Sequence, residues 1–312
     1  MNSQCRIYLL IPIFIAALAP MIWGSTYIVT SELLPDDMPF TAAVVRCIPA
    51  GVILLIMGNI QVRMSGIQFL HLTLLGLLNI GLFQACLFIA AYRLPGGIAA
   101  VIGAIQPLLI LMMIWLAEQT KPAISSLLAC VAAVAGMSAL VLSPDAQWDT
   151  FGGLAAFIGA ASMALGTYLG QRWRSDMPLL PFTGWQLLLG GVMLLPASIW
   201  VDPDLPSLTT VQYAAFAYLC LFGALLAYTL WFYGLGKLPP AAMASLGLLS
   251  PLSAVTLGWV FLDQQITGWG LLGLVTVLLS IFIVQISNTN SKVHKNNSAS
   301  AQPATSTSES YL

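Results

Sequence analysis

Ten long apolar runs restrict the fold of this chain more than any other feature. They lie at about 8–30, 39–58, 69–91, 98–118, 123–143, 152–171, 180–201, 211–233, 241–262 and 268–286. A helix needs about 20 apolar residues to cross roughly 30 Å of hydrocarbon. Charged residues make up only 7% of the chain, against about 25% in a soluble domain. The sequence therefore predicts a multi-pass membrane protein with ten transmembrane helices.

The two ends of the chain differ in character. The first run resembles a signal peptide, because Arg6 precedes it and residues 17–19 (Ala-Leu-Ala) resemble a cleavage site. The run continues to Val29 and nine similar runs follow, so we interpret residues 1–30 as the first transmembrane helix. Residues 287–312 are polar and low in complexity, which predicts a disordered cytoplasmic tail.

The distribution of lysine and arginine predicts the orientation, because these residues are enriched in cytoplasmic loops. With a cytoplasmic N-terminus, ten crossings put the following basic residues inside: Arg6, Arg63, Lys121, Arg172, Arg174, Lys292 and Lys295. Arg93 and Lys237 then lie outside, and Arg46 lies within a span. We expect both termini to be cytoplasmic.

The two halves of the chain resemble each other. Residues 93–115 align without gaps onto residues 237–259 at an offset of 144. The identical pairs are Leu94/Leu238, Pro95/Pro239, Ala100/Ala244, Gly103/Gly247, Pro107/Pro251, Leu108/Leu252 and Trp115/Trp259. Shorter matches pair Pro39-Phe40-Thr41 with Pro181-Phe182-Thr183, and Thr26-Tyr27 with Thr167-Tyr168.

This repeat predicts the fold class. We expect an all-α membrane protein with ten transmembrane helices in two inverted five-helix repeats, over residues 8–143 and 152–286. Five crossings are an odd number, so the second repeat crosses the membrane in the opposite sense. Inverted repeats are common in secondary transporters, whose substrate site lies near the midplane between the repeats.

Two prolines near the middle of spans four and nine mark candidate positions on a substrate pathway. A proline cannot donate a hydrogen bond to the carbonyl four residues earlier, which belongs to Gly103 for Pro107 and to Gly247 for Pro251. Exposed backbone at this depth is tolerated inside protein or beside a water-filled cavity. The alternative is a packing kink. The candidates are Gly103, Gln106, Pro107, Gly247, Ser250 and Pro251.

Arg46 is the charged residue that lies well inside a span. A charge at that depth costs about 2.5–3.5 kcal/mol on insertion scales. Arg46 is therefore a candidate for attracting a carboxylate or another anionic group of a substrate. Snorkelling toward the membrane surface, or a structural hydrogen bond to a carbonyl, is an equally good explanation.

Further polar and aromatic residues lie within the spans, and Ser25 and Asn79 are among them. Those that we add to the pathway candidates are Trp23, Thr26, Tyr27, Gln84, Tyr168, Gln186, Tyr228 and Trp231. Singly, such residues more often join helix to helix. Together they predict an amphipathic cavity with aromatic walls, suited to a small organic solute.

Several chemistries lack their motifs in this chain. There is no Walker loop, no His-Glu-x-x-His and no Gly-x-Ser-x-Gly motif. The cysteines form no Cys-x-x-Cys pair, and His71 and His294 lack companions at metal-ligand spacing. We therefore expect no catalytic residues, no cofactor, no metal and no nucleic-acid partner. The partners that we expect are a small-molecule substrate and the lipid bilayer.

Two alternatives to a transporter remain from the residues alone. An intramembrane enzyme or lipid-handling protein would need acids or histidines clustered at one depth. A non-transporting membrane scaffold would explain ten spans but not the inverted repeat. Spans five and ten are rich in small residues, which favours close helix packing within one subunit or in a homodimer.

Three elements resemble a known family. They are Trp23-Gly24-Ser25-Thr26-Tyr27, Arg46 followed by Pro49-Ala50-Gly51, and the twice-used Leu-Pro…Ala…Gly…Pro pattern. Together they resemble the drug/metabolite transporter (DMT) superfamily, in its EamA-type members with ten helices. The segments 90–97 (AAYRLPGG) and 185–187 (WQL) are similar to the PecM-like branch. The resemblance implies a secondary exporter of amino acids, metabolites or toxic compounds in the bacterial inner membrane. One departure is Leu188, which stands where the second repeat would align with Arg46.

Overall fold

The computed structural model describes residues 3–35, 38–58, 64–93, 101–141, 149–173, 177–261 and 268–300. In these ranges every regular element is a helix. The first half contains α1 (Ser3–Leu33), α2 (Pro39–Met57), α3 (Gly66–Gly76), η1 (Leu77–Leu82), α4 (Phe83–Arg93), α6 (Gln106–Glu118) and α7 (Ile124–Val141). The second half contains α8 (Thr150–Arg172), α9 (Leu179–Trp200), α10 (Thr210–Tyr218), η2 (Leu219–Leu226), α11 (Ala227–Leu235), α12 (Pro240–Gly247), α13 (Leu249–Phe261) and α14 (Trp269–Ser300).

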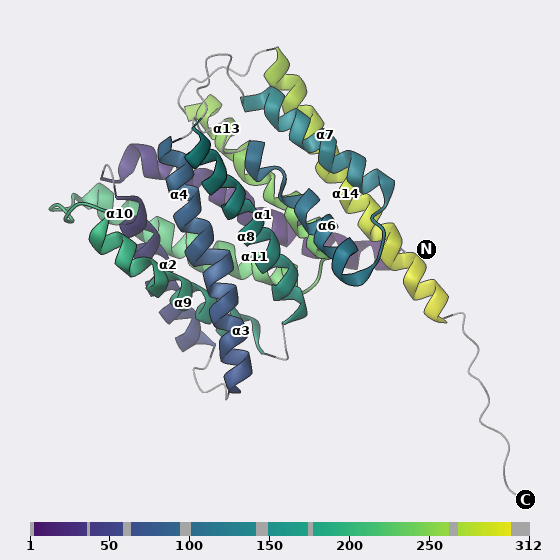
Figure 1. The fold of residues 1–312 in the computed structure, drawn as a ribbon, viewed down its shortest axis with the longest axis horizontal. Helices are drawn as coiled ribbons and strands as arrows, with labels where there is room; N and C mark the ends of the chain where they lie inside the picture. Colours follow the sequence, from purple (N-terminus) through teal and green to yellow (C-terminus); the bar gives the residue numbers. More distant parts are fainter. Residues whose placement is uncertain are drawn as a thin grey trace, which may run out of the picture.

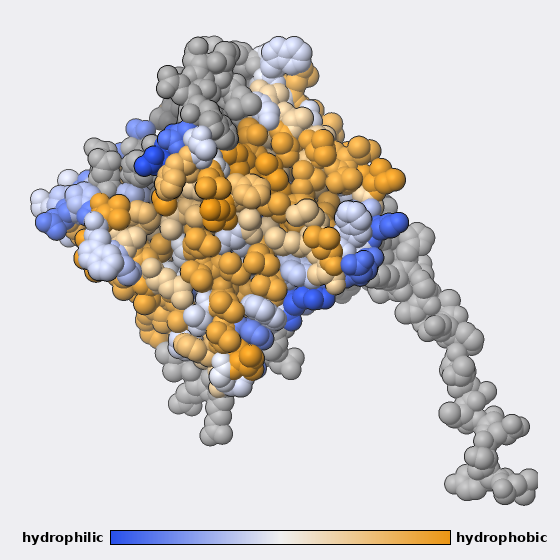
Figure 2. Space-filling model, viewed as in Figure 1, coloured by the Kyte–Doolittle hydropathy of each residue, from blue (hydrophilic) through white to orange (hydrophobic). Residues whose placement is uncertain are grey.

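These helices confirm the all-helical prediction of ten membrane-crossing segments. Within the described ranges, nine segments are long and apolar enough to cross a membrane, and Ile124–Leu140 is a shorter apolar helix. Apolar side chains cover the middle of the visible face, whereas hydrophilic ones gather at two opposite margins (Figure 2). Trp200 and Trp269 are 83% and 77% exposed near span ends, as in the aromatic belts of membrane proteins.

The two halves resemble each other in local structure as well as in sequence. Ser65 and Thr209, which are 144 residues apart, are each the N-cap of a helix and form a capping box with the glutamine three residues later. Each of these helices then passes through a π-helical segment, η1 or η2, before it continues as α4 or α11. The repeat therefore extends over spans three and eight, where few residues are identical.

The two halves are interleaved rather than stacked as separate bundles. α2 packs against α9 and η2, and α9 packs against η1 and α3. In the same way α1 packs against α11 and α13 of the second half, while α8 packs against α4 and α6 of the first (Figure 1). The first two helices of each repeat therefore lie against the later helices of the other, so the centre of the bundle is an interface between repeats.

Contacts at the two ends of the bundle agree with ten alternating crossings. At one end, which we call the Arg93 end, Arg93 pairs with Asp149 at 3.6 Å. At the other, the Arg172 end, Arg172 pairs with Glu118 at 3.4 Å. Each pair joins residues that the threading of ten spans puts on one side. Which end faces the cytoplasm stays a prediction from the basic residues.

α7 and α14 lie side by side at one margin of the bundle (Figure 1). Gly136 and Gly273 allow this approach, because a Cβ on Gly136 would lie 3.0 Å from the carbonyl oxygen of Gly273. α14 continues as a helix to Ser300, whereas composition predicts a disordered tail from residue 287. A helix that has begun in the membrane extends at one hydrogen bond per residue without a new nucleus. Residues 301–312 lie outside the described ranges.

Candidate functional site

Spans four and nine are broken, where the sequence predicts bends. The first helix stretch ends at Gly103, a turn covers Ala104 and Ile105, and α6 begins at Gln106. In span nine α12 ends at Gly247, and α13 begins at Leu249 after a one-residue turn. Both prolines therefore lie in the first turn of a new helix, where the missing N–H costs little. The breaks occupy equivalent positions in the two repeats.

The surroundings of the two breaks differ. A Cβ on Gly103 would meet no atom of the described residues within 4 Å, whereas one on Gly247 would lie 3.8 Å from the Trp231 ring. Gly24 of α1 packs so closely on α13 that a Cβ there would lie 2.7 Å from the Ser250 carbonyl oxygen. The second break is therefore bounded by α1 and by an aromatic ring, while the first has open space beside its glycine.

A cluster that we call the Arg46 site forms where α1 and α2 meet η2 and α11; its members are Trp23, Thr26, Arg46, Gly223, Tyr228 and Trp231. The Trp23 indole N–H donates to the Gly223 carbonyl oxygen at 3.0 Å. The Trp23 ring lies 4.9 Å from the ring of Tyr228 and 5.3 Å from that of Trp231. Tyr228 and Trp231 are each 2% exposed. Three aromatic rings from both halves thus line one side of the cluster.

Arg46 provides the charge of this site. The residue is half-buried, and its Nε atom is buried without a hydrogen-bond partner. Its guanidinium group interacts with the Tyr228 hydroxyl and the Cys47 thiol. A Cβ on Gly223 would lie 3.9 Å from Arg46 Cδ and 3.4 Å from the Thr26 methyl group. Both side chains therefore flank this glycine. No acidic partner of Arg46 appears among the described residues, so the site can attract an anionic group.

Most candidates from the second half and from α1 therefore come together. The structure brings Trp23, Thr26, Arg46, Tyr228 and Trp231 into one cluster, with Gly247, Ser250 and Pro251 beside it. Gly103, Gln106 and Pro107 lie at the other break. Tyr27 lies on α1, and its side chain is outside the described part of the structure.

Gln186 belongs to a different cluster, which contains Asn79, and Gln84 follows Asn79 by five residues. Gln84 and Gln186 are both buried, at 1% and 0% exposure. The Asn79 amide nitrogen donates to Gln186 Oε1 at 3.0 Å, and Gln186 Nε2 donates to the Phe182 carbonyl oxygen at 3.2 Å. Asn79 lies beside α8, because a Cβ on Gly166 would collide with its amide group. The pathway candidates omit Asn79 and Gly223. These two residues are 144 positions apart, like the two capping-box residues Ser65 and Thr209. They therefore occupy equivalent positions in the two repeats.

Tyr168 lies apart from both clusters. Its hydroxyl donates to Glu118 Oε1 at 3.4 Å, and the guanidinium group of Arg172 lies over its ring at 5.3 Å. Because Arg172 also pairs with Glu118, Tyr168 belongs to a charged contact between the halves at the Arg172 end. The match of Thr26-Tyr27 with Thr167-Tyr168 does not predict this difference.

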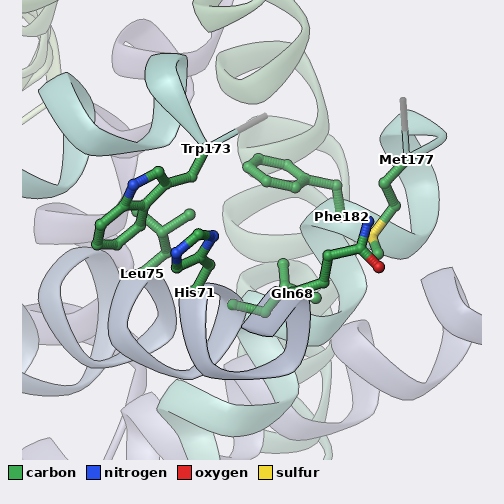
Figure 3. Close-up of a pocket in the computed structure, with 7 residues that line it drawn as sticks. Gln68, His71, Leu75, Trp173, Met177 and Phe182 are labelled. Atoms are coloured by element: carbon green, nitrogen blue, oxygen red, sulfur yellow. The ribbon is translucent and has the colours of Figure 1, made fainter. Parts of the chain in front are cut away.

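A small hollow also lies between the halves at the Arg172 end. Its lining residues are Gln68, His71, Leu72, Leu75, Trp173, Met177 and Phe182. The His71 and Trp173 rings stack at 4.2 Å, with Phe182 and Met177 on the other side of the hollow (Figure 3). No pathway candidate lines it, so we interpret it as part of the contact between α3 and the α8–α9 connection.

Contacts between the halves at the Arg93 end involve two helix N-termini. Asp149 is the N-cap of α8, where its Oδ1 accepts from the Gly152 N–H at 2.7 Å. That hydrogen bond and the charge of Arg93 hold the pKa of Asp149 below its ordinary value. Asp202, which follows α9, accepts from the Thr41 N–H in the first turn of α2. The second half thus caps a helix of the first half, whose own N-cap, Met38, makes no side-chain bond.

Comparison with known proteins identifies the family. The EamA-like transporter family matches residues 10–142 and again residues 150–286. The chain belongs to the EamA-like transporter family. Among relatives of this EamA-family chain, protein PecM of Dickeya dadantii (strain 3937) is 42% identical over 272 residues, which cover 86% of this chain and 90% of PecM.

More distant relatives agree with this assignment. The uncharacterized inner membrane transporter YedA of Escherichia coli (strain K12) is 28% identical over 286 residues, or 89% of this chain and 92% of YedA. A solved crystal structure shares the fold with a TM-score of 0.76 at 15% identity, over 89% of this chain and 98% of its own. The family is one of transporters, so this EamA-family chain is a multi-pass membrane transporter and not an enzyme.

Proposed function

We propose that this EamA-family transporter is a secondary exporter, and that it moves a small metabolite, amino acid or toxic compound by alternating access. The pathway that we propose runs through the Arg46 site and between the two helix breaks. We place the protein in the bacterial inner (cell) membrane with both termini in the cytoplasm. The direction of transport rests on the family resemblance, and the orientation rests on the basic residues. A homodimer stays a prediction from the small residues of α7 and α14.

The buried Nε of Arg46 is the observation that carries the proposal. An arginine within a span costs about 2.5–3.5 kcal/mol on insertion scales, and an unsatisfied buried N–H adds to that cost. The described contacts of Arg46, with a tyrosine hydroxyl and a thiol, include no anion that would neutralise it. A substrate carboxylate would supply both the missing acceptor and the missing charge.

The walls of the Arg46 site favour a solute that also has an apolar part. The Trp23 ring lies 4.9 Å from the ring of Tyr228 and 5.3 Å from that of Trp231, measured between ring centroids. Binding sites for small molecules are mostly apolar with a few polar groups that fix orientation. An amino acid or an aromatic carboxylate combines an anionic group with an apolar body, and we propose this class as substrate.

The interleaved halves support alternating access. At the Arg93 end the halves meet through Arg93 with Asp149 and through Thr41 with Asp202. At the Arg172 end they meet through Glu118 with Arg172 and through His71 with Trp173. A transporter opens one end while the other stays closed. Separate sets of contacts at the two ends would allow one end to open while the contacts at the other end stay closed.

An efflux experiment tests the proposal. Cells that overexpress the chain are loaded with a panel of amino acids and aromatic carboxylates, and retained solute is measured against empty-vector cells. We expect reduced retention of at least one anionic solute. Arg46→Ala should lower its efflux by about tenfold or more, because one charge-assisted contact is worth about 1.5–3 kcal/mol. Gln106→Ala should lower it less.

Controls separate transport from folding. Lys121→Ala removes an exposed basic residue of the connection between α6 and α7, and it should leave efflux close to wild type. Membrane insertion of each variant is measured by blotting of isolated membranes. Wild-type efflux from cells that carry Arg46→Ala at normal levels would remove the Arg46 site from the pathway. Uptake into liposomes with and without a pH gradient then shows whether protons are coupled.

A further inference from the structure

Four polar atoms of spans three and six are buried without a hydrogen-bond partner. They are Asn79 Oδ1, both amide atoms of Gln84, and Thr167 Oγ1. All three residues are 1% exposed. Buried polar groups are nearly always paired in folded proteins, so unpaired ones need an explanation such as a missing water, ion or ligand. We call these residues, together with Gln186, the amide site.

Neighbouring elements bring the amide site together. Asn79 donates to Gln186 of α9 at 3.0 Å, and it packs on Gly166 of α8, the residue before Thr167. Gln84 follows Asn79 by five residues across η1. A π-helix bonds residue i to residue i+5, so this turn moves Gln84 toward the face that carries Asn79. The unpaired atoms therefore come from spans three and six and lie beside span seven.

The internal repeat relates the amide site to the Arg46 site. The offset of 144 residues pairs Gln84 with Tyr228 and Asn79 with Gly223. The shorter offset between α1 and α8 pairs Thr167 with Thr26. In α9, Leu188 stands where α2 has Arg46. The two sites thus occupy equivalent places between the repeats, one with a charge and one without.

The two sites also adjoin the same helix. Ala85, next to Gln84, packs in one cluster with Phe40, Ala43 and Val44 of α2. Val44 lies two residues before Arg46. Both sites therefore adjoin α2 within one helical turn of each other along its axis, although Val44 and Arg46 point to different faces of the helix.

We propose that the amide site is a second substrate subsite, and that it takes a neutral hydrogen-bonding group of the solute whose anionic group binds Arg46. This inference rests on the proposed function. The free atoms comprise two amide oxygens that accept, one amide NH₂ group that donates, and a hydroxyl that does either. A carboxamide or lactam matches this set, because it donates and accepts side by side. The described residues of the site carry no charge to neutralise a charged group.

The probe is a matched set of carboxylates. It consists of 3-phenylpropanoate and its three derivatives with a ring carboxamide in the ortho, meta or para position, which vary the distance between the two groups. Transport of each is measured in proteoliposomes of the full chain. We expect kcat/KM for at least one carboxamide to exceed that of the parent by about tenfold or more, because a buried polar site discriminates against ligands that leave it unpaired.

Gln84→Leu changes a glutamine whose amide atoms have no hydrogen-bond partner. Gln186→Leu is its matched control, because it changes a glutamine whose amide atoms are paired. Gln84→Leu should lower kcat/KM for the preferred carboxamide to that of the parent in the same variant, and it should keep or raise Tm in detergent, because it removes unpaired buried atoms. Gln186→Leu should lower Tm, because it leaves the Asn79 amide nitrogen unpaired. Gln84→Met serves in the same way if Gln84→Leu does not insert.

The outcomes separate this subsite from the proposed function. Transport of the parent without any carboxamide preference overturns the subsite alone, and an ordered water as sole occupant would give that result. A preference that survives Gln84→Leu overturns it too. Loss of all transport with a fall in Tm equal to that of Gln186→Leu makes Gln84 structural. If the wild-type chain moves no carboxylate, the proposed substrate class fails, and the subsite fails with it.

Discussion

The π-helical segments η1 and η2 hold equivalent places in the two repeats, but the residues beside them differ in kind. Next to η2, Trp23, Tyr228 and Trp231 surround the single charge of Arg46. Next to η1 the corresponding space contains neutral amides and a threonine hydroxyl. The duplication has therefore kept the backbone plan, with its caps, π segments and helix breaks, while the side chains of the two central sites have diverged.

Under the proposed function, this difference would let a symmetric scaffold hold an asymmetric solute. Two identical sites would favour a ligand with two identical ends. A charged site and a neutral site, placed against the same helix, favour a solute with one anionic end and one neutral end. The symmetry of the backbone still allows the two ends of the bundle to exchange roles, because the broken helices and the π segments occur in both halves.

The largest effect that we expect concerns the aromatic residues of the Arg46 site. Trp231 is the largest fully buried side chain in the described part of the chain. Trp231→Ala should lower the free energy of unfolding by about 3–5 kcal/mol, because it leaves a cavity between α1 and α11. Thermal unfolding in detergent measures this change. Trp200→Ala is the control, since Trp200 is 83% exposed; an equal effect of both would show that Trp231 is not a packing centre.

A matched pair of glycine substitutions compares the two sites directly. A Cβ on Gly166 would collide with the Asn79 amide, whereas one on Gly223 would meet its nearest atoms at 3.4 Å or more. Gly166→Ala should therefore destabilise the protein by about 1–3 kcal/mol through overpacking. Gly223→Ala should be neutral or stabilise it by about 0.5–1 kcal/mol, because alanine is the better helix former.

The same thermal scan in detergent gives both values for this pair. Equal Tm shifts in the two variants would contradict the difference in space between the sites. A stable Gly166→Ala protein that no longer prefers carboxamides would instead show that Asn79 moved without harm to the fold. Such a protein would still transport the parent carboxylate.

Most of the fold could be predicted from the sequence, because membrane crossing depends on composition over about 20 residues. The spans, the repeat and the positions of both breaks follow from apolar runs and from Gly and Pro in register. The kind of break could not be predicted in the same way. A proline four residues after a glycine fits a kinked helix and two separate helices equally well, and the packing of α1 against Ser250 is a property of the tertiary structure.

The candidate site was predictable only in part. Arg46 stood out because a charge is rare within a span, and the structure places aromatic candidates around it. Tyr168 looked equivalent to Tyr27, but it lies near Glu118 and Arg172, because a tyrosine one turn from a helix end reaches the charges there. Asn79 and Thr167 became notable only as atoms without partners, and a sequence does not show which polar groups remain unpaired.

The smallest effect that we expect concerns the N-cap of α8 at the Arg93 end. α8 begins at Asp149, whose carboxylate bonds the Gly152 N–H and faces Arg93. The folded pKa of Asp149 lies below its ordinary value, so the ionised form favours the folded state. Its contribution is present above an ordinary pKa of about 4 and is lost as the pH falls through the folded pKa. Asp149→Asn should lower Tm slightly at pH 7, and the gap to the wild type should close in acid. A gap that stayed constant from pH 7 to below the folded pKa would mean that the charge of Asp149 contributes nothing to the difference in Tm.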